Sequence, residues 1–201
     1  MFDRHAIVLI RRPLALIAHP LARWGISANQ ISITGFFIGM LSLPLLAFGQ
    51  FEEALICILL NRIMDGLDGA IARIHGITDC GGFLDITLDF IFYAAVVWGF
   101  ALASPANALP AATLLFAFMG TGSSFLAFDI MAGKRGIENP VYHHKSLYYL
   151  GGLTEGSETI ALFVLMCLLP HWFAPLAYGF ATLCLITVAT RLWSGYHSLK
   201  S

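Results

Sequence analysis

Long apolar stretches recur along most of this chain of 201 residues, and they limit what it can fold into. Hydrophobic residues make up 58% of the sequence and charged residues only 11%, whereas about a quarter of the residues in soluble domains are charged. The mean hydropathy of +0.79 is too high for a chain that buries its apolar side chains in one water-soluble core. The sequence therefore predicts an all-α integral membrane protein.

A membrane-spanning helix needs roughly 20 mostly apolar residues. Six segments are candidates, and they are Ile31–Phe48, Ala54–Arg73, Gly82–Ala103, Leu109–Met131, Glu158–Pro170 and Phe173–Trp193. The fifth segment is short and could begin near Leu153, and aspartates lower the hydropathy of the second and third. We expect six transmembrane helices that form a single membrane domain over residues 25–201.

The basic residues test this topology, because cytoplasmic loops of membrane proteins are enriched in Lys and Arg. The predicted loops Gln50–Glu53, Ser104–Ala108 and Pro170–Trp172 contain neither residue type. With six spans, all eleven basic residues fall on the other side of the membrane or in the helix halves nearest to it. We expect that side to be cytoplasmic and to hold both termini. The compact size fits a bacterial cytoplasmic membrane, and no nucleic-acid partner is expected.

Residues 1–24 have a different pattern. Apolar residues recur there at spacings of three and four with arginines between them, and they are Ile7, Ile10, Leu14, Ile17, Leu21 and Trp24. This pattern predicts an interfacial amphipathic helix, which Pro13 and Pro20 interrupt or bend. The alternative is a basic tail without regular structure.

Four aspartates interrupt the second and third apolar segments, and charges within a membrane are costly and usually functional. They lie in the stretch Asn61–Phe90 as two pairs, Asp65 with Asp68 and Asp85 with Asp89. Spacings of three and four residues place each pair on one helix face. Because only a short turn joins the two helices, we expect the four carboxylates to face one another at a similar depth near the cytoplasmic side.

Four carboxylates at close range cannot all stay ionised without cations. Hard oxygen ligands in this number suit Mg²⁺, Mn²⁺ or Ca²⁺. Arg73 could bind a phosphate, and the neighbouring glycines allow a ligand to approach the backbone closely. Together these features fit a diphosphate-containing substrate. The alternative is that the carboxylates only pair with basic side chains and hold the bundle together; those side chains are Arg62, Arg73 and Lys145.

This stretch resembles the signature of the CDP-alcohol phosphotransferase family, which is D-x-x-D-G-x-x-A-R, eight residues, and then G-x-x-x-D-x-x-x-D. Its positions are filled here by Asp65, Asp68, Gly69, Ala72, Arg73, Gly81, Asp85 and Asp89. Seven residues rather than eight separate Arg73 from Gly81, and we expect this to reshape the interhelical turn without removing a ligand. Before the first span, Asn29 and Ser32 lie in a variant of the family's P-N-x-(I/L)-T pattern and are expected to cap that helix.

The resemblance implies a reaction of phospholipid biosynthesis. A CDP-linked lipid such as CDP-diacylglycerol binds with its diphosphate on the metal ions, an alcohol attacks the phosphorus next to the lipid, and CMP leaves. It implies that Asp65, Asp68 and Asp85 hold one Mg²⁺ or Mn²⁺ ion, while Asp89 shares in a second and serves as the general base. It also implies that Gly69, Arg73 and Asp68 contact the CDP moiety, and that the protein forms a homodimer.

The alcohol acceptor is less well defined by the sequence. Lys145 and Arg191 could clamp an anionic acceptor such as a sugar phosphate, or they could contact lipid headgroups. Glu155 could meet a cationic head group, or it could cap and charge the start of the fifth helix.

Two other functions fit part of the pattern. An intramembrane prenyltransferase also binds magnesium diphosphate through aspartate-rich helices, but its two motifs usually lie far apart in a longer chain. A divalent-cation transporter would also place aspartates within spans, although such sites often lie at the midplane between repeated halves, and this sequence has no visible repeat. The first predicts no release of CMP, and the second predicts metal flux without turnover of a CDP-lipid.

Overall fold

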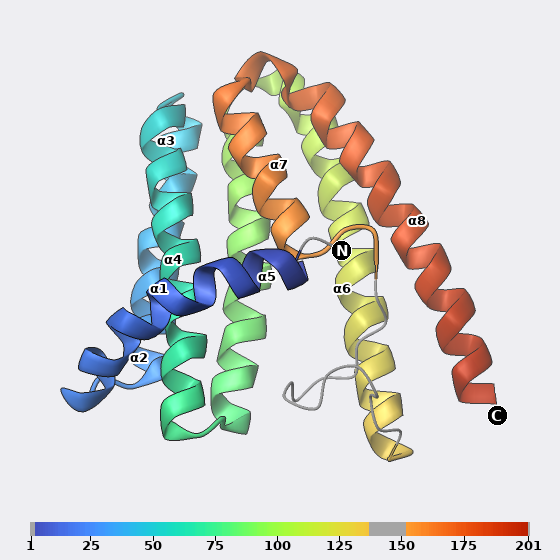
Figure 1. Ribbon diagram of the computed structural model, residues 1–201. Coiled ribbons are helices and arrows are strands. Elements are labelled where there is room, and N and C mark those ends of the chain that lie inside the picture. Colours follow the sequence, from blue (N-terminus) through green and yellow to red (C-terminus); the bar gives the residue numbers. More distant parts are fainter. Residues whose placement is uncertain (1–2, 137–151, 201) are drawn as a thin grey trace.

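The computed structural model describes residues 3–136 and 152–200, with side chains from Pro13 onward. Every regular element in these ranges is a helix. The order is α1 (Asp3–Arg23), α2 (Ala28–Met40), α3 (Ser42–Ala47), α4 (Phe51–His75), α5 (Asp79–Ala103), η1 (Pro105–Asn107), α6 (Ala108–Lys134), α7 (Gly156–Leu168), η2 (Pro170–Trp172) and α8 (Phe173–Lys200). The long helices stand side by side, and α1 runs across them (Figure 1). The predicted all-α class is confirmed for the described residues.

Four helical stretches of the described chain are long and apolar enough to cross a membrane, and they are Ala28–Ala47, Asp79–Ala103, Pro105–Lys134 and Pro170–Lys200. They correspond to the first, third, fourth and sixth predicted spans. Helix α4 has sufficient length, but charged residues of both signs lower its hydropathy. Helix α7 has 13 residues, fewer than a span of the usual length needs. Both pack within the same bundle, and the number of six spans stays a prediction.

The first predicted span is two helices rather than one. Helix α2 ends at Met40 and α3 begins at Ser42. Pro44 has no N–H to donate to the carbonyl of Met40, and its ring would clash with that carbonyl in a continuous helix. The break between α2 and α3 therefore follows from Pro44. Hydropathy alone does not reveal it, because the whole segment is apolar.

The predicted cap of this helix was wrong. Ser27, rather than Asn29 or Ser32, is the N-cap: its hydroxyl accepts a hydrogen bond from the backbone N–H of Gln30 at 3.3 Å. Oε1 of Gln30 accepts a hydrogen bond from the backbone N–H of Ser27 at 2.9 Å, which completes a capping box. Ser32 lies more than one turn inside α2, and its side chain turns toward α4 instead.

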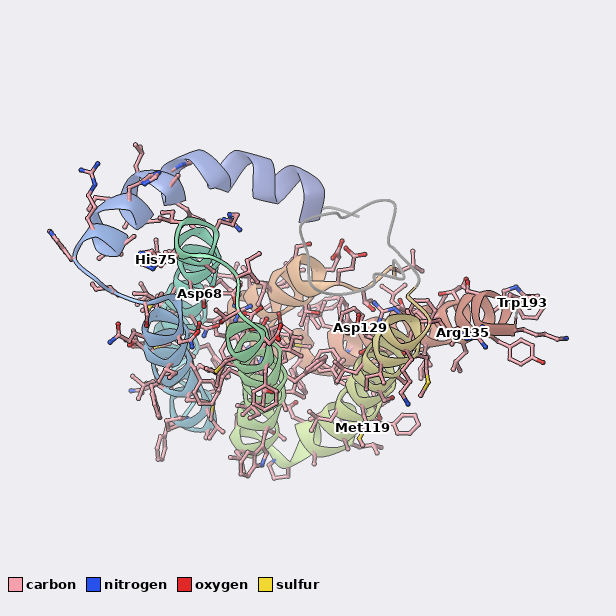
Figure 2. All side chains as sticks on the ribbon, turned by 90° about the horizontal axis from the view of Figure 1, so that it is seen from below. Asp68, His75, Met119, Asp129, Arg135 and Trp193 are labelled. Atoms are coloured by element: carbon pink, nitrogen blue, oxygen red, sulfur yellow. The ribbon has the colours of Figure 1, made fainter. Side chains whose placement is uncertain are left out.

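Helix α1 packs against α4. Its residues Leu14 and Ala18 belong to a small apolar cluster with Leu67 and Ile71 of α4. A Cβ at Gly66 would lie 2.8 Å from Cδ1 of Leu14, so the glycine permits this close approach. Figure 2 shows α1 along the outside of the bundle, beside the end of α4.

Of the two predicted effects of Pro13 and Pro20, interrupting or bending the helix, the interruption was wrong, because both lie inside a helix that continues to Arg23. Two residues of its predicted apolar face are exposed, Ile17 to 52% and Trp24 to 76%. The position of residues 1–24 at the membrane interface stays a prediction.

The apolar core and the aspartates occupy different halves of the bundle. The largest fully buried side chains include Phe92, Phe100, Phe163 and Phe173, and the rings of Phe100 and Phe173 stack with their centroids 4.8 Å apart. This core lies toward α3 and the beginning of α4, whereas the aspartates lie toward the turn between α4 and α5 (Figure 1). The apolar core thus fixes the positions of α4 and α5, the helices that carry the aspartates.

Candidate metal centre

Helices α4 and α5 form an antiparallel hairpin that is closed by Gly76, Ile77 and Thr78. Gly76 has a φ of 101°, a conformation that favours glycine. The hydroxyl of Thr78 caps α5 by accepting a hydrogen bond from the backbone N–H of Gly81 at 3.1 Å. This tight turn accommodates the spacing of seven residues between Arg73 and Gly81.

Three of the four predicted metal ligands come together across the hairpin. One carboxylate oxygen from each of Asp65, Asp68 and Asp85 lies within 4.8 Å of the other two. Asp68 is buried, Asp65 is half-buried and Asp85 is exposed, so the cluster is accessible from one side. The three side chains line a pocket between α2, α4 and α5, and Asp89 lines it as well.

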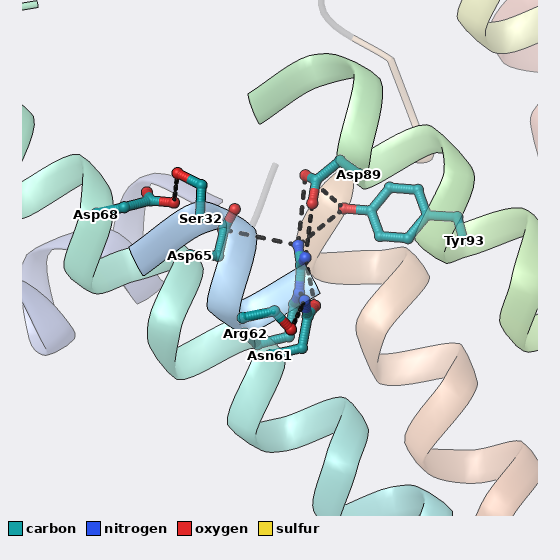
Figure 3. Close-up of polar contacts among 8 residues, drawn as sticks. Ser32, Asn61, Arg62, Asp65, Asp68, Asp89 and Tyr93 are labelled. Atoms are coloured by element: carbon teal, nitrogen blue, oxygen red, sulfur yellow. Dashed lines mark hydrogen bonds and ion pairs between the residues drawn. The ribbon is translucent and has the colours of Figure 1, made fainter. Parts of the chain in front are cut away.

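Helix α2 contributes a hydroxyl to this cluster. Oγ of Ser32 donates a hydrogen bond to Oδ2 of Asp68 at 2.5 Å (Figure 3). The bond orients a buried carboxylate and leaves its other oxygen for a further partner. The sequence predicted Ser32 as a helix cap and did not indicate this contact with Asp68.

Asp89 lies in the same pocket, but its partners are a cation and a phenol. Nη2 of Arg62 donates a hydrogen bond to Oδ1 of Asp89 at 2.6 Å, and Nη1 donates to Oδ2 at 3.4 Å. The hydroxyl of Tyr93 lies 3.3 Å from the same Oδ2 and donates to it. Nη1 of Arg62 is also 3.6 Å from Oδ2 of Asp65. Figure 3 shows the guanidinium between Asp65 and Asp89.

Arg62 forms an ion pair with Asp89, which is one contact that the structural alternative predicted. Tyr93 was not predicted for the site. The spacing of Arg62 and Tyr93 from the aspartates could have indicated both residues. Arg62 precedes Asp65 by three residues and Tyr93 follows Asp89 by four, and these spacings place side chains on the same helix face.

Gly69 and Arg73, the two residues expected at the CDP moiety, lie together near the end of α4. A Cβ at Gly69 would be 3.5 Å from Nη1 of Arg73, so the guanidinium lies back over the open face of the glycine. Arg73 is exposed. This arrangement presents a cation beside bare backbone, one turn from Asp68, and the contact with CDP stays a prediction.

Arg191 and Glu155, the two described residues that are expected at the acceptor, do not line this pocket. Arg191 is buried in α8, where its Nη1 donates a hydrogen bond to the carbonyl of Thr121 in α6 at 3.0 Å. Glu155 is the N-cap residue of α7 and forms a capping box with Glu158, which is one of its two expected roles. Lys145 lies outside the described residues.

The carboxylate cluster fits a divalent cation. Oxygens from three carboxylates this close repel one another strongly in a partly apolar setting, unless a cation or protons neutralise them. Carboxylate oxygens are the ligands of hard ions such as Mg²⁺ and Mn²⁺. Because Asp85 is exposed, the cluster can be reached from outside the bundle.

A helical bundle with apolar spans and a carboxylate cluster on a helix hairpin defines an integral membrane protein with an acidic site suited to a metal ion. The sequence profile described as CDP-alcohol phosphatidyltransferase matches residues 25–193. The chain belongs to this family.

The chain is similar to curated relatives and to solved structures. The inner membrane protein YnjF of Escherichia coli (strain K12) is 57% identical over 202 residues, which cover 100% of this chain and 98% of that protein. Archaetidylinositol phosphate synthase of Pyrococcus horikoshii is 37% identical over 94 residues, which cover 46% of this chain and 50% of that protein.

Both solved structures are of the phosphatidylinositol phosphate synthase PgsA1 of Mycobacterium tuberculosis. The one with CDP-DAG bound has a TM-score of 0.74 at 21% identity and covers 92% of this chain and 94% of that chain. The complex with manganese and citrate has a TM-score of 0.69 at 22% identity and covers 91% of this chain and 88% of that chain. At these identities the likeness shows a shared fold.

Proposed function

We propose that this protein transfers a phosphatidyl group from a CDP-linked lipid to an alcohol and releases CMP. The observation that carries the proposal is the convergence of Asp65, Asp68 and Asp85 within 4.8 Å in a member of this family. The CDP-DAG bound in a PgsA1 structure of the same fold supports a CDP-lipid as the donor substrate.

In this proposal Asp65, Asp68 and Asp85 would hold Mg²⁺ or Mn²⁺, which the manganese in the second PgsA1 structure supports. When bound, the ion neutralises the charge of the diphosphate and of the departing CMP. Ser32 orients Asp68, while Gly69 and Arg73 would contact the CDP moiety beside the ion. A second ion at Asp89, which the family resemblance implies, stays a prediction.

Asp89 is the proposed general base. The alcohol oxygen forms a new bond to the phosphorus next to the lipid, the bond from that phosphorus to CMP breaks, and the proton of the alcohol passes to the carboxylate of Asp89. Arg62 and Tyr93 hold this carboxylate at the pocket wall in a fixed orientation. A positioned base of this kind typically contributes a factor of about 100 to 10,000 to the rate.

The chain is proposed to lie in a bacterial inner membrane with the site and both termini on the cytoplasmic side. The relative YnjF, an inner membrane protein, supports the location. Arg73, Lys134 and Lys200 lie at helix ends on the same side of the bundle, which supports the orientation (Figure 1). A homodimer stays a prediction.

The acceptor decides which lipid is made. Arg191 and Lys145 are proposed at a phosphate of the acceptor, and Glu155 at a cationic group if the acceptor carries one. Archaetidylinositol phosphate synthase and phosphatidylinositol phosphate synthase are both similar to this chain, so a phosphorylated inositol is the first acceptor to test.

A panel of acceptors tests this proposal. The purified protein in lipid nanodiscs receives CDP-diacylglycerol, Mn²⁺ and one alcohol at a time: inositol phosphate, glycerol phosphate, free inositol, glycerol, serine or ethanolamine. We expect stoichiometric CMP and a new lipid with one phosphorylated acceptor, and loss of that activity in Arg191→Gln. Absence of CMP release with every acceptor would contradict the proposed function, and turnover of prenyl diphosphate instead would favour a prenyltransferase.

A further inference from the structure

Arg191 lies on the buried face of α8, and its guanidinium contacts α6. Nη1 donates a hydrogen bond to the carbonyl of Thr121 at 3.0 Å, and the guanidinium carbon lies 5.6 Å from the ring centroid of Phe125. Only 7% of Arg191 is exposed. A cation inside a membrane bundle is costly, and such residues usually belong to a functional site. The contacts with α6 fix one part of this guanidinium.

The segment 152–155, which leads into α7, lies beside the same guanidinium. A Cβ at Gly152 would be 3.2 Å from Nη2 of Arg191, and it would overlap Cγ2 of Thr187. Only a residue without a Cβ therefore fits between this segment and α8. The carboxylate of Glu155 holds the same residue from within the segment, because its Oε1 accepts a hydrogen bond from the backbone N–H of Gly152 at 3.3 Å.

Thr187 binds the segment to α8. It is fully buried and lies one turn before Arg191 on the same face of the helix. Its Oγ1 accepts hydrogen bonds from the backbone N–H of Leu153 at 3.1 Å and from the hydroxyl of Thr154 at 3.1 Å. It donates to the carbonyl of Leu183 at 3.0 Å. A hydroxyl offers one donor and two acceptor positions, so all of its capacity for hydrogen bonds is used.

The segment is therefore a fixed neighbour of the guanidinium. The proposed function places Arg191 at a phosphate of the acceptor. A guanidinium binds phosphate through N–H groups that lie in one rigid plane, so its orientation decides how strongly it binds. A shift of the segment would free the guanidinium on the side of Nη2 and change that orientation.

We propose that Thr187 and Gly152 are positioning residues for Arg191, and that they set the affinity for a phosphorylated acceptor. Thr187 fixes the segment to α8, and Gly152 leaves space for the guanidinium beside it. The placement of the segment concerns the fold alone, whereas the effect on the acceptor rests on the proposed function.

Hydrogen exchange of the full chain in nanodiscs, measured by mass spectrometry, tests the placement without any substrate. Thr187→Val keeps the shape of the side chain but removes the hydroxyl, so the backbone N–H of Leu153 loses its partner. We expect this amide to exchange at least about tenfold faster than in the wild type. Thr187→Ser keeps the hydroxyl, and its exchange should stay within about threefold of the wild type.

Thr182→Val is the matched control for Thr187→Val. Thr182 is exposed on α8, and its hydroxyl donates to the carbonyl of Tyr178 at 2.9 Å, one turn back, as that of Thr187 does. This variant should leave the exchange of the segment unchanged. Unchanged exchange in Thr187→Val, or equal acceleration in Thr187→Ser, overturns the proposed placement. Equal acceleration in α5 would mean a general loosening of the bundle and would overturn it as well.

Initial rates of CMP release test the effect on the acceptor, with inositol phosphate, or with glycerol phosphate if the wild type prefers it. Thr187→Val is expected to raise the KM for this acceptor about tenfold, as for a weakened charged hydrogen bond. The kcat and the KM for the CDP-lipid should stay within about threefold of the wild type, because the carboxylate cluster lies on α4 and α5. An unchanged KM for the acceptor, or an equal rise in both KM values, overturns the positioning role and leaves the proposed function intact.

Gly152→Ala covers the case in which Thr187→Val does not fold. The added Cβ would push the segment away from Cγ2 of Thr187, so we expect a similar rise of about tenfold in the KM for the phosphorylated acceptor. Thr187→Ser removes this methyl group and keeps the hydroxyl. In the double variant the KM should therefore return to within about threefold of the wild type. No rise in Gly152→Ala, or a rise that Thr187→Ser does not reverse, contradicts the role of this contact.

The wild type separates a failure of this inference from a failure of the proposed function. Turnover only with acceptors that carry no phosphate would overturn the effect on the acceptor, while the transfer reaction would stand. Absence of CMP release with every acceptor would contradict the proposed function itself. The exchange measurement would still decide whether Thr187 holds the segment against α8.

Discussion

Replacing Asp89 by asparagine is expected to lower the rate of CMP release by about a thousandfold, within the range for loss of a general base. The amide has nearly the same shape as the carboxylate, and its oxygen can still accept a hydrogen bond from Arg62 or Tyr93. It cannot accept the proton of the attacking alcohol at neutral pH. We therefore expect the loss in kcat rather than in the KM for the CDP-lipid. Initial rates of CMP release at saturating Mn²⁺ and acceptor measure both constants.

Asp79→Asn is the matched control for this variant. Asp79 is an exposed residue in the first turn of α5, on the same helix as Asp89 but outside the pocket. The rate of CMP release by Asp79→Asn should stay within about twofold of the wild type, because an exposed substitution away from the site changes little. Size-exclusion profiles and circular dichroism of both variants check the fold. A folded Asp89→Asn protein with wild-type turnover would exclude this carboxylate as the proton acceptor.

Replacing Asp68 by asparagine is expected to remove metal binding and activity together. Asp68 is the most buried member of the carboxylate cluster, and Ser32 orients it. Loss of one anionic ligand of three should raise the Kd for Mn²⁺ by more than about 100-fold, since loss of a supporting residue alone typically costs 10-fold to 100-fold. Titration of the purified variant with Mn²⁺, without substrate, measures this directly.

Ser32→Ala is a milder change at the same carboxylate. It keeps the carboxylate and removes only the hydrogen bond that orients it, so we expect a rise in Kd of about tenfold. Equal effects of the two variants would mean that the whole arrangement of α2 and α4 has changed. No effect of Asp68→Asn on Mn²⁺ binding would mean that the ion binds elsewhere.

Local spacing accounts for the part of the site that the sequence predicts well. Asp65 and Asp68 share one face of α4, and the short turn after His75 brings Asp85 opposite them. These relations depend only on helix geometry and on a turn too short to allow another arrangement. The sequence was therefore sufficient for three of the four carboxylates.

The partner of Asp89 depends on packing between helices. Arg62 could reach Asp65 on its own helix or Asp89 on the next, and it bonds closely to Asp89 at 2.6 Å while staying 3.6 Å from Asp65. Asn61 and the rings of Phe92 and Tyr93 decide between these positions. This choice depends on side chains of two packed helices, and the spacing of residues along the sequence does not predict it.

Arg191 shows the same limit over a longer distance. Its position late in the last helix indicates a cation near the end of the bundle that is predicted to be cytoplasmic, but its hydrogen bond reaches the carbonyl of Thr121. A contact between residues 70 positions apart depends on how α6 and α8 pack. The break at Pro44 is different, because the proline was visible in the sequence and hydropathy obscured its effect on the helix.

Asp65, Asp68 and Asp85 are proposed to hold one divalent ion between α4 and α5. Anomalous X-ray diffraction at the manganese absorption edge, from crystals of the protein grown with Mn²⁺, locates that ion directly. We predict an anomalous peak at bonding distance from a carboxylate oxygen of each of these residues. Ordered carboxylates with no peak between them, or a peak at another group of side chains, would contradict the account.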